Sequence, residues 1–496
     1  MRPTPSTAPA GEPWSWPATA LAAALARREV SATEAVAAHL ARISAIDPQL
    51  AAFVTVAADP AQERAARLDR MPTPLGPLHG MPIAIKDLTD VAGMRTTYGS
   101  ALYAGHVPTA SDAVVERLER AGAIIVGKTN TPEFGFGAIC TNALLGPTRN
   151  PHDETLTSGG SSGGAAVAVA TGMVPLAHGT DFGGSVRTPA GFCGVASIRP
   201  TPGLVPAPGR ALGFDTLATH GVLARSVADA MLMLSAIAGP DPRDPVSLGM
   251  ALGRGDGDGE GPIRIAAVAD FGVAPVADEV RGLFDRALAV VAQAVGPVAR
   301  STPECGDAIA AFRTLRAAHI RHQYGPLAVA HGERLSASVR WNVAQGEGIG
   351  AQAYLEAQAA RTALYRRFVA FFERHDVLVA PAASVQPWPN DAGEVSAIDG
   401  RALASIVDYL AVTFIVSLAG MPVVTVPAAW TDTGLPFGIQ LIGPPGSDAR
   451  LAAIAMRFER AAGFVHRWPR RYAPAGATHG RGPGATAAPV ASQAQR

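Results

Sequence analysis

Two serine-bearing glycine clusters lie close together in this chain, and they restrict its local structure more than any other feature does. Their sequences are "TSGGSSGG" at Thr157–Gly164 and "TDFGGSVRTPAG" at Thr180–Gly191. Glycine admits positive φ angles and close approach by other groups, at an entropic cost that a purely structural loop seldom carries twice with serines embedded. The pair therefore indicates that this part of the chain performs chemistry.

The segments around the clusters alternate between strand and helix patterns. "LHGMPIAIKDL" is typical of a short buried strand, and "SDAVVERLERAGAIIVGKTN" predicts a capped helix, a glycine stop and another buried strand. "GGAAVAVATGMVPLAHGTD" repeats this order, with a small-residue helix that stops at Gly172 before the next strand. The alternation predicts the α/β class, with both clusters at the ends of strands or helices.

Further elements are predicted toward the two ends of the chain. Apolar residues recur at helical spacing over residues 18–46, where Ser31 and Glu34 form a capping-box signature, so two helices are expected. "TVPAAWTDTGLPFGIQLIG" predicts a β-hairpin, and a helix is expected after it at Asp448–Ala462.

The domain organisation follows from these patterns and from local composition. Residues 18–470 are predicted to form a single α/β domain, preceded by an N-terminal extension over residues 1–17. The segment "GRGDGDGEG", residues 253–261, is predicted to be a flexible linker between two halves of that domain. Residues 471–496 are rich in Gly, Ala, Pro and Gln and are predicted to be a disordered tail.

Composition favours small-molecule chemistry in a reducing compartment. The 41 basic and 41 acidic residues give a formal charge of zero, so neither a nucleic acid nor an anionic membrane is the expected partner. The three cysteines are far apart without CxxC spacing, which predicts no disulfide framework and no zinc site. The start of the chain has prolines where an export signal needs an apolar run, so a cytoplasmic location is expected.

The glycine clusters suit acyl transfer better than phosphate binding. The P-loop pattern needs a lysine after its last glycine and the dinucleotide fingerprint needs GxGxxG, and neither is present at the clusters. Acyl transfer needs a nucleophile, a base and N–H donors for an oxyanion, and "FGGS" supplies donors around Ser185. None of the twelve histidines lies in a GxSxG elbow, so Lys86 is the better base, provided that burial keeps it neutral.

These residues belong to a longer set of motifs that resembles a known family. "GMPIAIKD", "GKTNTPEFG", "TRNP", "GGSSGGAAVAVATGMVPLAHGTDFGGSVRTPAGFCG" and "RPTPGLVP", at about residues 75–207, resemble the core of the amidase signature family. "GMPVVTVPAA" with "GLPFGIQLIG" resembles its C-terminal block. The resemblance implies an α/β fold in which helices cover both faces of a mixed central β-sheet. It also implies that residues 262–410 form much of the substrate pocket.

The family's site residues are carried over position by position. The resemblance implies a Ser-Ser-Lys triad in which Ser185 is the nucleophile, Lys86 is the base, and Ser161 bridges the two. It also implies that the peptide bond before Ser161 is cis. The implied oxyanion donors are the backbone amides of Phe182, Gly183, Gly184 and Ser185. The supporting residues are Ser162 and Thr180, which would hydrogen-bond near the triad, and Asp181 and Arg187, which would shape the loop. A structural salt bridge between Asp181 and Arg187 is favoured over contact with the substrate. Neither a metal nor an organic cofactor is required.

The chain departs from the family pattern just after the nucleophile. In "CGVASIRPT", Ala196, Ser197 and Arg199 stand where a glycine-containing stretch and a lysine are usual. We expect a consequence for packing only, because these residues lie past the catalytic positions.

The resemblance implies an amide-bond hydrolase that works through an acyl-enzyme. Its activity should fall at acidic pH, where Lys86 becomes charged and can no longer accept a proton. The glutamine-hydrolysing component of a glutamyl-tRNA amidotransferase, its A subunit, is the alternative, although that class usually continues differently after the core block.

We expect a neutral apolar or aryl amide as substrate, with carbamates, esters and oligoamides open, because the pocket segments show no cluster of arginines or lysines. A homodimer also stays open. The aromatic and apolar pocket candidates, of which only a minority should line it, are Tyr324, Trp341, Tyr354, Trp388, Tyr409, Phe414 and Ile415.

Overall fold

The computed structural model describes residues 9–253 and 261–476. In these residues eleven strands form one mixed sheet, in the order β1-β3-β2-β4-β6-β5-β12-β13-β9-β7-β8. The strands are β1 Phe53–Val56, β2 Pro82–Lys86, β3 Ile124–Thr129, β4 Leu176–Asp181, β5 Ala196–Arg199, β6 Thr219–Ala224, β7 Ile265–Ala267, β8 Val298–Arg300, β9 Val377–Pro381, β12 Val423–Trp430 and β13 Pro436–Ile442. A separate small hairpin joins β10 Ala397–Ile398 to β11 Arg401–Ala402.

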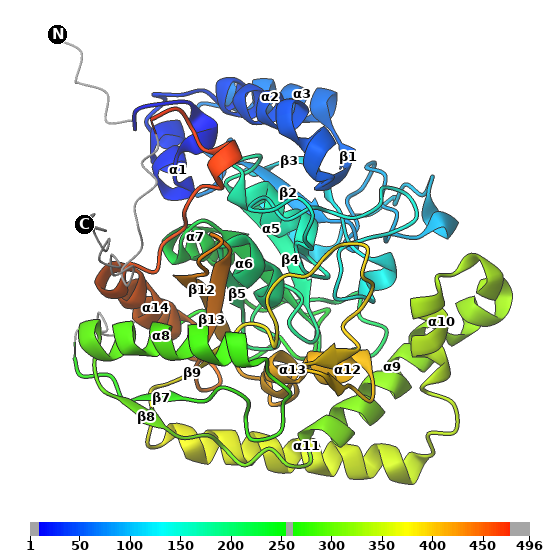
Figure 1. Ribbon diagram of the computed structural model, residues 1–496. Coiled ribbons are helices and arrows are strands. Elements are labelled where there is room, and N and C mark those ends of the chain that lie inside the picture. Colours follow the sequence, from blue (N-terminus) through cyan, green and yellow to red (C-terminus); the bar gives the residue numbers. More distant parts are fainter. Residues whose placement is uncertain (1–8, 254–260, 477–496) are drawn as a thin grey trace, which may run out of the picture.

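Helices cover both faces of this sheet, as the resemblance implied (Figure 1). They are α1 Ala18–Ala26, α2 Ala32–Leu50, α3 Ala58–Asp69, α4 Ala113–Arg120, α5 Gly163–Ala170, α6 Arg187–Cys193, α7 Val227–Ile237, α8 Asp278–Ala294, α9 Ala308–His331, α10 Ala337–Ala344, α11 Ala351–Phe372, α12 Ile406–Tyr409, α13 Ala411–Leu418 and α14 Asp448–Ala462. Helices α5 and α6 pack together on one side, while α7, α8 and α14 form a second group against the same sheet. The predicted α/β class is confirmed.

The sheet is parallel where it carries the predicted chemistry. Strand β2 lies between β3 and β4 and is parallel to both, and all five of its residues are buried. Parallel strands buried on both faces have continuous apolar runs, which explains "PIAI" before Lys86. The carboxyl ends of β2 and β4 therefore meet at one edge of the sheet, which brings Lys86 close to Thr180.

Several local predictions are confirmed at residue level. Ser31 and Glu34 form a capping box at the start of α2, and Glu34 N–H donates to Ser31 Oγ at 3.1 Å. Strands β12 and β13 pair as the expected antiparallel hairpin, and α14 spans Asp448–Ala462. Gly172 ends the small-residue segment with a φ of 75°.

The predicted ends of the domain need correction. Trp16 belongs to the buried core, so the packed domain begins before residue 18. Tyr472, in a short 3-10 helix at Arg470–Tyr472, is also buried, and its hydroxyl donates to Glu154 Oε1 at 2.5 Å. The predicted tail beginning at 471 is therefore wrong for this residue, because its buried aromatic ring extends the packed region. The part of the predicted tail from residue 477 onward lies outside the described residues. So does the part of the predicted linker between residues 253 and 261.

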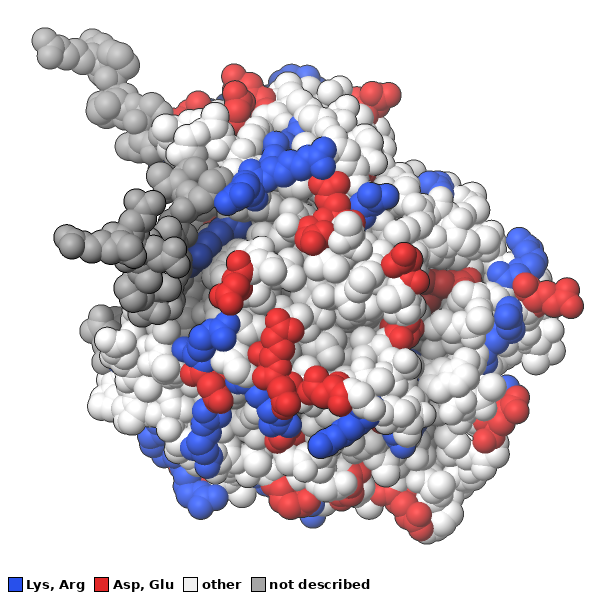
Figure 2. Space-filling view, viewed as in Figure 1, with Lys and Arg blue, Asp and Glu red and all other residues white. Residues whose placement is uncertain are grey.

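The surface is consistent with the balanced composition. On the face shown in Figure 2, lysine and arginine side chains are interspersed with aspartate and glutamate. No helix in the described ranges is both long and apolar enough to cross a membrane.

Candidate active site

Lys86 lies at the carboxyl end of β2 and contacts three hydroxyl groups. Its side chain is fully buried, and Nζ hydrogen-bonds Ser161 Oγ at 2.6 Å, Ser162 Oγ at 2.9 Å and Thr180 Oγ1 at 3.0 Å. Ser161 and Ser162 come from the first glycine cluster, and Thr180 from the end of β4. The structure thus brings three other predicted site residues into contact with the Lys86 amine.

The environment of Lys86 disfavours its charged form. Burial lowers the pKa of the Lys86 ammonium to about 7, although Cys140 and Asp181 act in the opposite direction. Its nearest partners are neutral hydroxyls, each of which can donate to a neutral amine or accept from a charged one. A lysine with this pKa can accept a proton near neutral pH.

The first glycine cluster brings Ser161 under the amine. The peptide bond between Gly160 and Ser161 is cis, as the resemblance implied. A side chain at Gly160 would place its Cβ 2.5 Å from the Gly137 carbonyl oxygen, so only glycine fits there. Ser162 N–H donates to the Ser185 carbonyl oxygen at 3.0 Å, and this bond ties the two clusters together.

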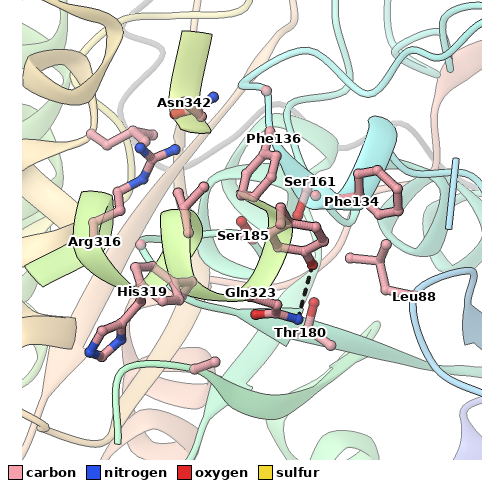
Figure 3. A pocket seen from close by; sticks show the side chains of 18 of the residues that line it. Leu88, Phe134, Phe136, Ser161, Thr180, Ser185, Arg316, His319, Gln323 and Asn342 are labelled. Atoms are coloured by element: carbon pink, nitrogen blue, oxygen red, sulfur yellow. Dashed lines mark hydrogen bonds between the residues drawn. The ribbon is translucent and has the colours of Figure 1, made fainter. Parts of the chain in front are cut away.

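Ser185 lies between β4 and α6 and lines a cavity. Ser161, Gly183 and Phe182 line the same cavity, and Figure 3 shows both serine side chains in it. Within the described residues the backbone amides of Phe182, Gly183 and Ser185 donate to no other group. Three predicted oxyanion donors are therefore unoccupied.

Gly184 differs from the prediction. Its N–H donates to Asp181 Oδ1 at 3.0 Å, so this amide is already engaged and the expectation that it holds an oxyanion is not supported. The glycine is needed for another reason. Its φ is +122°, and an added Cβ would lie 2.5 Å from Thr413 Oγ1, whose hydroxyl donates to the Gly183 carbonyl oxygen at 2.6 Å.

We expect Gly184→Ala to lower kcat by about 10²-fold, because the clash with Thr413 would shift the neighbouring amides and displacements near 1 Å at a reacting centre have costs of this order. The measurement is amide hydrolysis under saturating substrate. Gly272→Ala is the control, since Gly272 also has a positive φ, of +73°, but an added Cβ there meets nothing within 4 Å. Equal kcat values for the two variants would contradict this account of Gly184.

Asp181 organises the loop that carries Ser185, because its carboxylate accepts from the Gly184 and Val186 amides. Its carboxylate accepts from Arg187 Nη2 at 2.8 Å and from Arg199 Nη1 at 3.2 Å, and all three side chains are fully buried. Burial alone would raise the pKa of the Asp181 carboxyl, but the two arginines hold it well below its ordinary value. The predicted Asp181–Arg187 salt bridge is present. Arg199 does more than pack, because its guanidinium also donates to the carboxylate that holds the Gly184 amide.

The cavity has a volume of about 330 Å³ and is lined mainly by apolar and aromatic side chains from both halves of the chain. Lining residues that sequence reasoning missed are Leu88, Phe134, Phe136, Phe312, Arg316 and Ile320. Phe134 and Phe136 fall within or beside the recognised block "GKTNTPEFG", whereas Phe312 and Arg316 lie on α9, where nothing in the sequence separates them from ordinary helix residues.

Of the proposed aromatics Tyr324 lines the cavity, and Phe414 lies behind it, stacked on Phe312 with ring centroids 3.9 Å apart. In the described part of the chain, no three His, Cys, Asp or Glu side chains gather as a metal site would require.

Comparisons with known proteins agree with this geometry. A family model described as Amidase matches residues 34–452. The chain is 35% identical over 464 residues to the A subunit of the glutamyl-tRNA(Gln) amidotransferase of Symbiobacterium thermophilum, covering 87% of this chain and 94% of the relative. It is 34% identical over 465 residues to the acylamidase of Rhodococcus erythropolis, covering 89% and 94%.

A solved structure of a bacterial aryl acylamidase of the amidase signature enzymes superposes with a TM-score of 0.83 at 29% identity, covering 90% of this chain and 96% of that one. The peptide amidase of Stenotrophomonas maltophilia superposes with a TM-score of 0.76 at 29% identity, covering 92% and 98%.

Proposed function

This chain belongs to the amidase family, and we propose from that premise that it hydrolyses amide bonds by itself through an acyl-enzyme on Ser185. The observation that carries the proposal is the contact of 2.6 Å between Ser161 and a buried Lys86, beside a cavity lined by Ser185 and by unengaged amides. A serine needs a base and an oxyanion site to attack an amide, and both are within this arrangement.

The proposed reaction begins with neutral Lys86. As Ser185 Oγ attacks the substrate carbonyl, its proton passes to Ser161, whose own proton passes to Lys86 Nζ. The amides of Phe182, Gly183 and Ser185 stabilise the tetrahedral oxyanion. The proton returns through Ser161 to the leaving amine, the C–N bond breaks, and water activated by the same groups releases the carboxylate product.

The walls of the cavity favour a substrate with an apolar or aryl body. Phe134, Phe136 and Phe312 line the same cavity as the two serines, and aromatic walls bind apolar groups by burial and by edge or face contacts. The similarity to an aryl acylamidase and to an acylamidase supports the same class. Carbamates, esters and oligoamides with such a body belong to the proposed range.

The second candidate function is that of the A subunit in a glutamyl-tRNA amidotransferase, which would release ammonia from glutamine within a complex. It rests on the 35% identity to such a protein over most of the chain. The stand-alone function is favoured by the similarity to acylamidase structures and by the apolar lining of the cavity.

The test is a panel of aryl and alkyl amides, anilides, carbamates, esters and glutamine, assayed with the purified chain alone. We expect amine release from the apolar or aryl amides and much slower turnover of glutamine. Hydrolysis of glutamine alone, appearing only once the other components of an amidotransferase are added, would contradict the stand-alone function and favour the second candidate.

A further inference from the structure

Arg316 is a charged residue in the substrate cavity without a charged partner. It lies on α9 between Phe312 and Ile320, and all three line the cavity. Within the described residues its guanidinium forms no ion pair and no hydrogen bond, and its one aromatic neighbour is Phe136, with the ring centroid 5.8 Å from Cζ. Arg316 is half-buried, and burial lowers its pKa to about 10, so the group is still charged near neutral pH.

The other arginines of the same helix are neutralised. Arg313 pairs with Asp408, and Arg321 Nη1 lies 3.0 Å from Glu347 Oε1. The carboxylates that line the cavity are engaged elsewhere, since Asp215 lies 3.5 Å from His319 Nδ1 and Glu394 accepts from Ala138 N–H at 3.0 Å. A partly desolvated charge without a charged partner costs free energy, which a bound anion would offset.

Asn342 lies at the same part of the cavity and is only 2% exposed. Its Nδ2 donates to the Ser338 carbonyl oxygen at 2.8 Å, whereas Oδ1 has no hydrogen-bond partner in the described residues. Figure 3 shows the Arg316 guanidinium pointing toward Asn342. An amide oxygen carries no net charge, so Asn342 can orient the guanidinium but cannot compensate it.

We propose that Arg316 is a specificity-determining residue that binds a carboxylate of the substrate, so that the preferred substrate is an amide with an apolar or aryl body and a carboxylate remote from the amide bond. This rests on the proposed hydrolase function. The guanidinium presents paired N–H donors that match a carboxylate, and a desolvated cavity strengthens such pairs. The sequence-based expectation of a neutral substrate is thereby revised, because one unpaired arginine inside the cavity suffices where no cluster was visible.

The test uses two matched series of amides. In one, monoanilides of glutaric, adipic and pimelic acids, which carry a carboxylate on the acyl chain, are compared with hexananilide. In the other, acetylated aminobenzoates, which carry it on the amine, are compared with acetanilide. We expect wild type to prefer the charged member of one series in kcat/KM, and Arg316→Gln to reduce that preference about 10- to 100-fold.

Arg321→Gln is the matched control, since it removes the same charge from the same helix outside the cavity and should keep the wild-type preference. The proposal is overturned if wild type hydrolyses the neutral members of both series at least as well, or if Arg316→Gln retains the preference. Failure of wild type to hydrolyse any member of either series would instead overturn the hydrolase function, so the two failures are distinguishable.

Discussion

Replacing Ser185 by alanine is expected to lower kcat by about 10⁵- to 10⁶-fold, the loss typical of removing the nucleophile of a serine hydrolase. In the proposed mechanism Ser185 supplies the oxygen that forms the acyl-enzyme, and it lines the cavity together with Ser161, which Lys86 contacts. The residual rate would come from binding and from the amides that stabilise the oxyanion. Single-turnover and steady-state hydrolysis of the best amide measure the loss.

The control is Ser158→Ala in the first glycine cluster. Ser158 is buried, its hydroxyl donates to the Thr148 carbonyl oxygen at 3.0 Å, and it does not line the cavity. This variant should keep most of the wild-type kcat. Comparable losses of kcat in the two variants would mean that the serines of both glycine clusters matter for folding alone. That result would contradict the role of Ser185.

Lys86→Met is expected to lower kcat/KM by about 10²- to 10⁴-fold, the range that general acid–base catalysis supplies. Methionine fills most of the same space but accepts no proton, so Ser161 loses the group that activates it. The pH profile gives a second readout. Lys86 becomes charged as the pH falls through about 7, the value of its lowered pKa, so wild-type kcat/KM should rise with pH across that range. The residual activity of Lys86→Met should lack this limb.

Lys128→Met is the matched control, because Lys128 is the second buried lysine of the same sheet. Burial lowers the pKa of Lys128 to about 8, and its Nζ lies 3.4 Å from Asp87 Oδ1. Its removal leaves a buried carboxylate without its ion-pair partner, which costs about 3–5 kcal/mol of unfolding free energy. Thermal melts should therefore show lower stability while the acidic limb of the activity persists. An unchanged limb in Lys86→Met would show that another group is the base.

The sequence was most informative where structure depends on neighbours along the chain. The strand before Lys86, the hairpin of β12 and β13 and the capping box at Ser31 follow from periodicity, turn residues and cap chemistry, which act over a few residues. The grouping of Lys86, Ser161, Ser162 and Thr180 came from resemblance to a family. Spacing along the sequence alone could not have shown that the hydroxyls of the other three residues contact the Lys86 amine.

The features that sequence analysis missed depend on contacts between distant residues. Arg199, from β5, donates to the Asp181 carboxylate that also holds the Gly184 amide, and this contact between residues 18 apart has no local signal. Arg313, on the same helix as Arg316, pairs with Asp408, which lies far along the chain, whereas Arg316 lines the cavity and has no such partner in the described residues. Whether an arginine is paired is a property of the folded cavity, so the sequence pattern could not show that Arg316 has no ion-pair partner in the described part of the chain.

The central claim is a covalent bond between the substrate's acyl group and Ser185, and mass spectrometry of the labelled protein tests it most directly. The chain would be incubated with a fluorophosphonate probe, which reacts with activated serines, and the adduct would be located by peptide mapping. The account predicts one adduct, on Ser185, that is absent from Ser185→Ala and strongly reduced in Lys86→Met. An adduct on a different residue, or unmodified Ser185 in protein that hydrolyses amides, would contradict it.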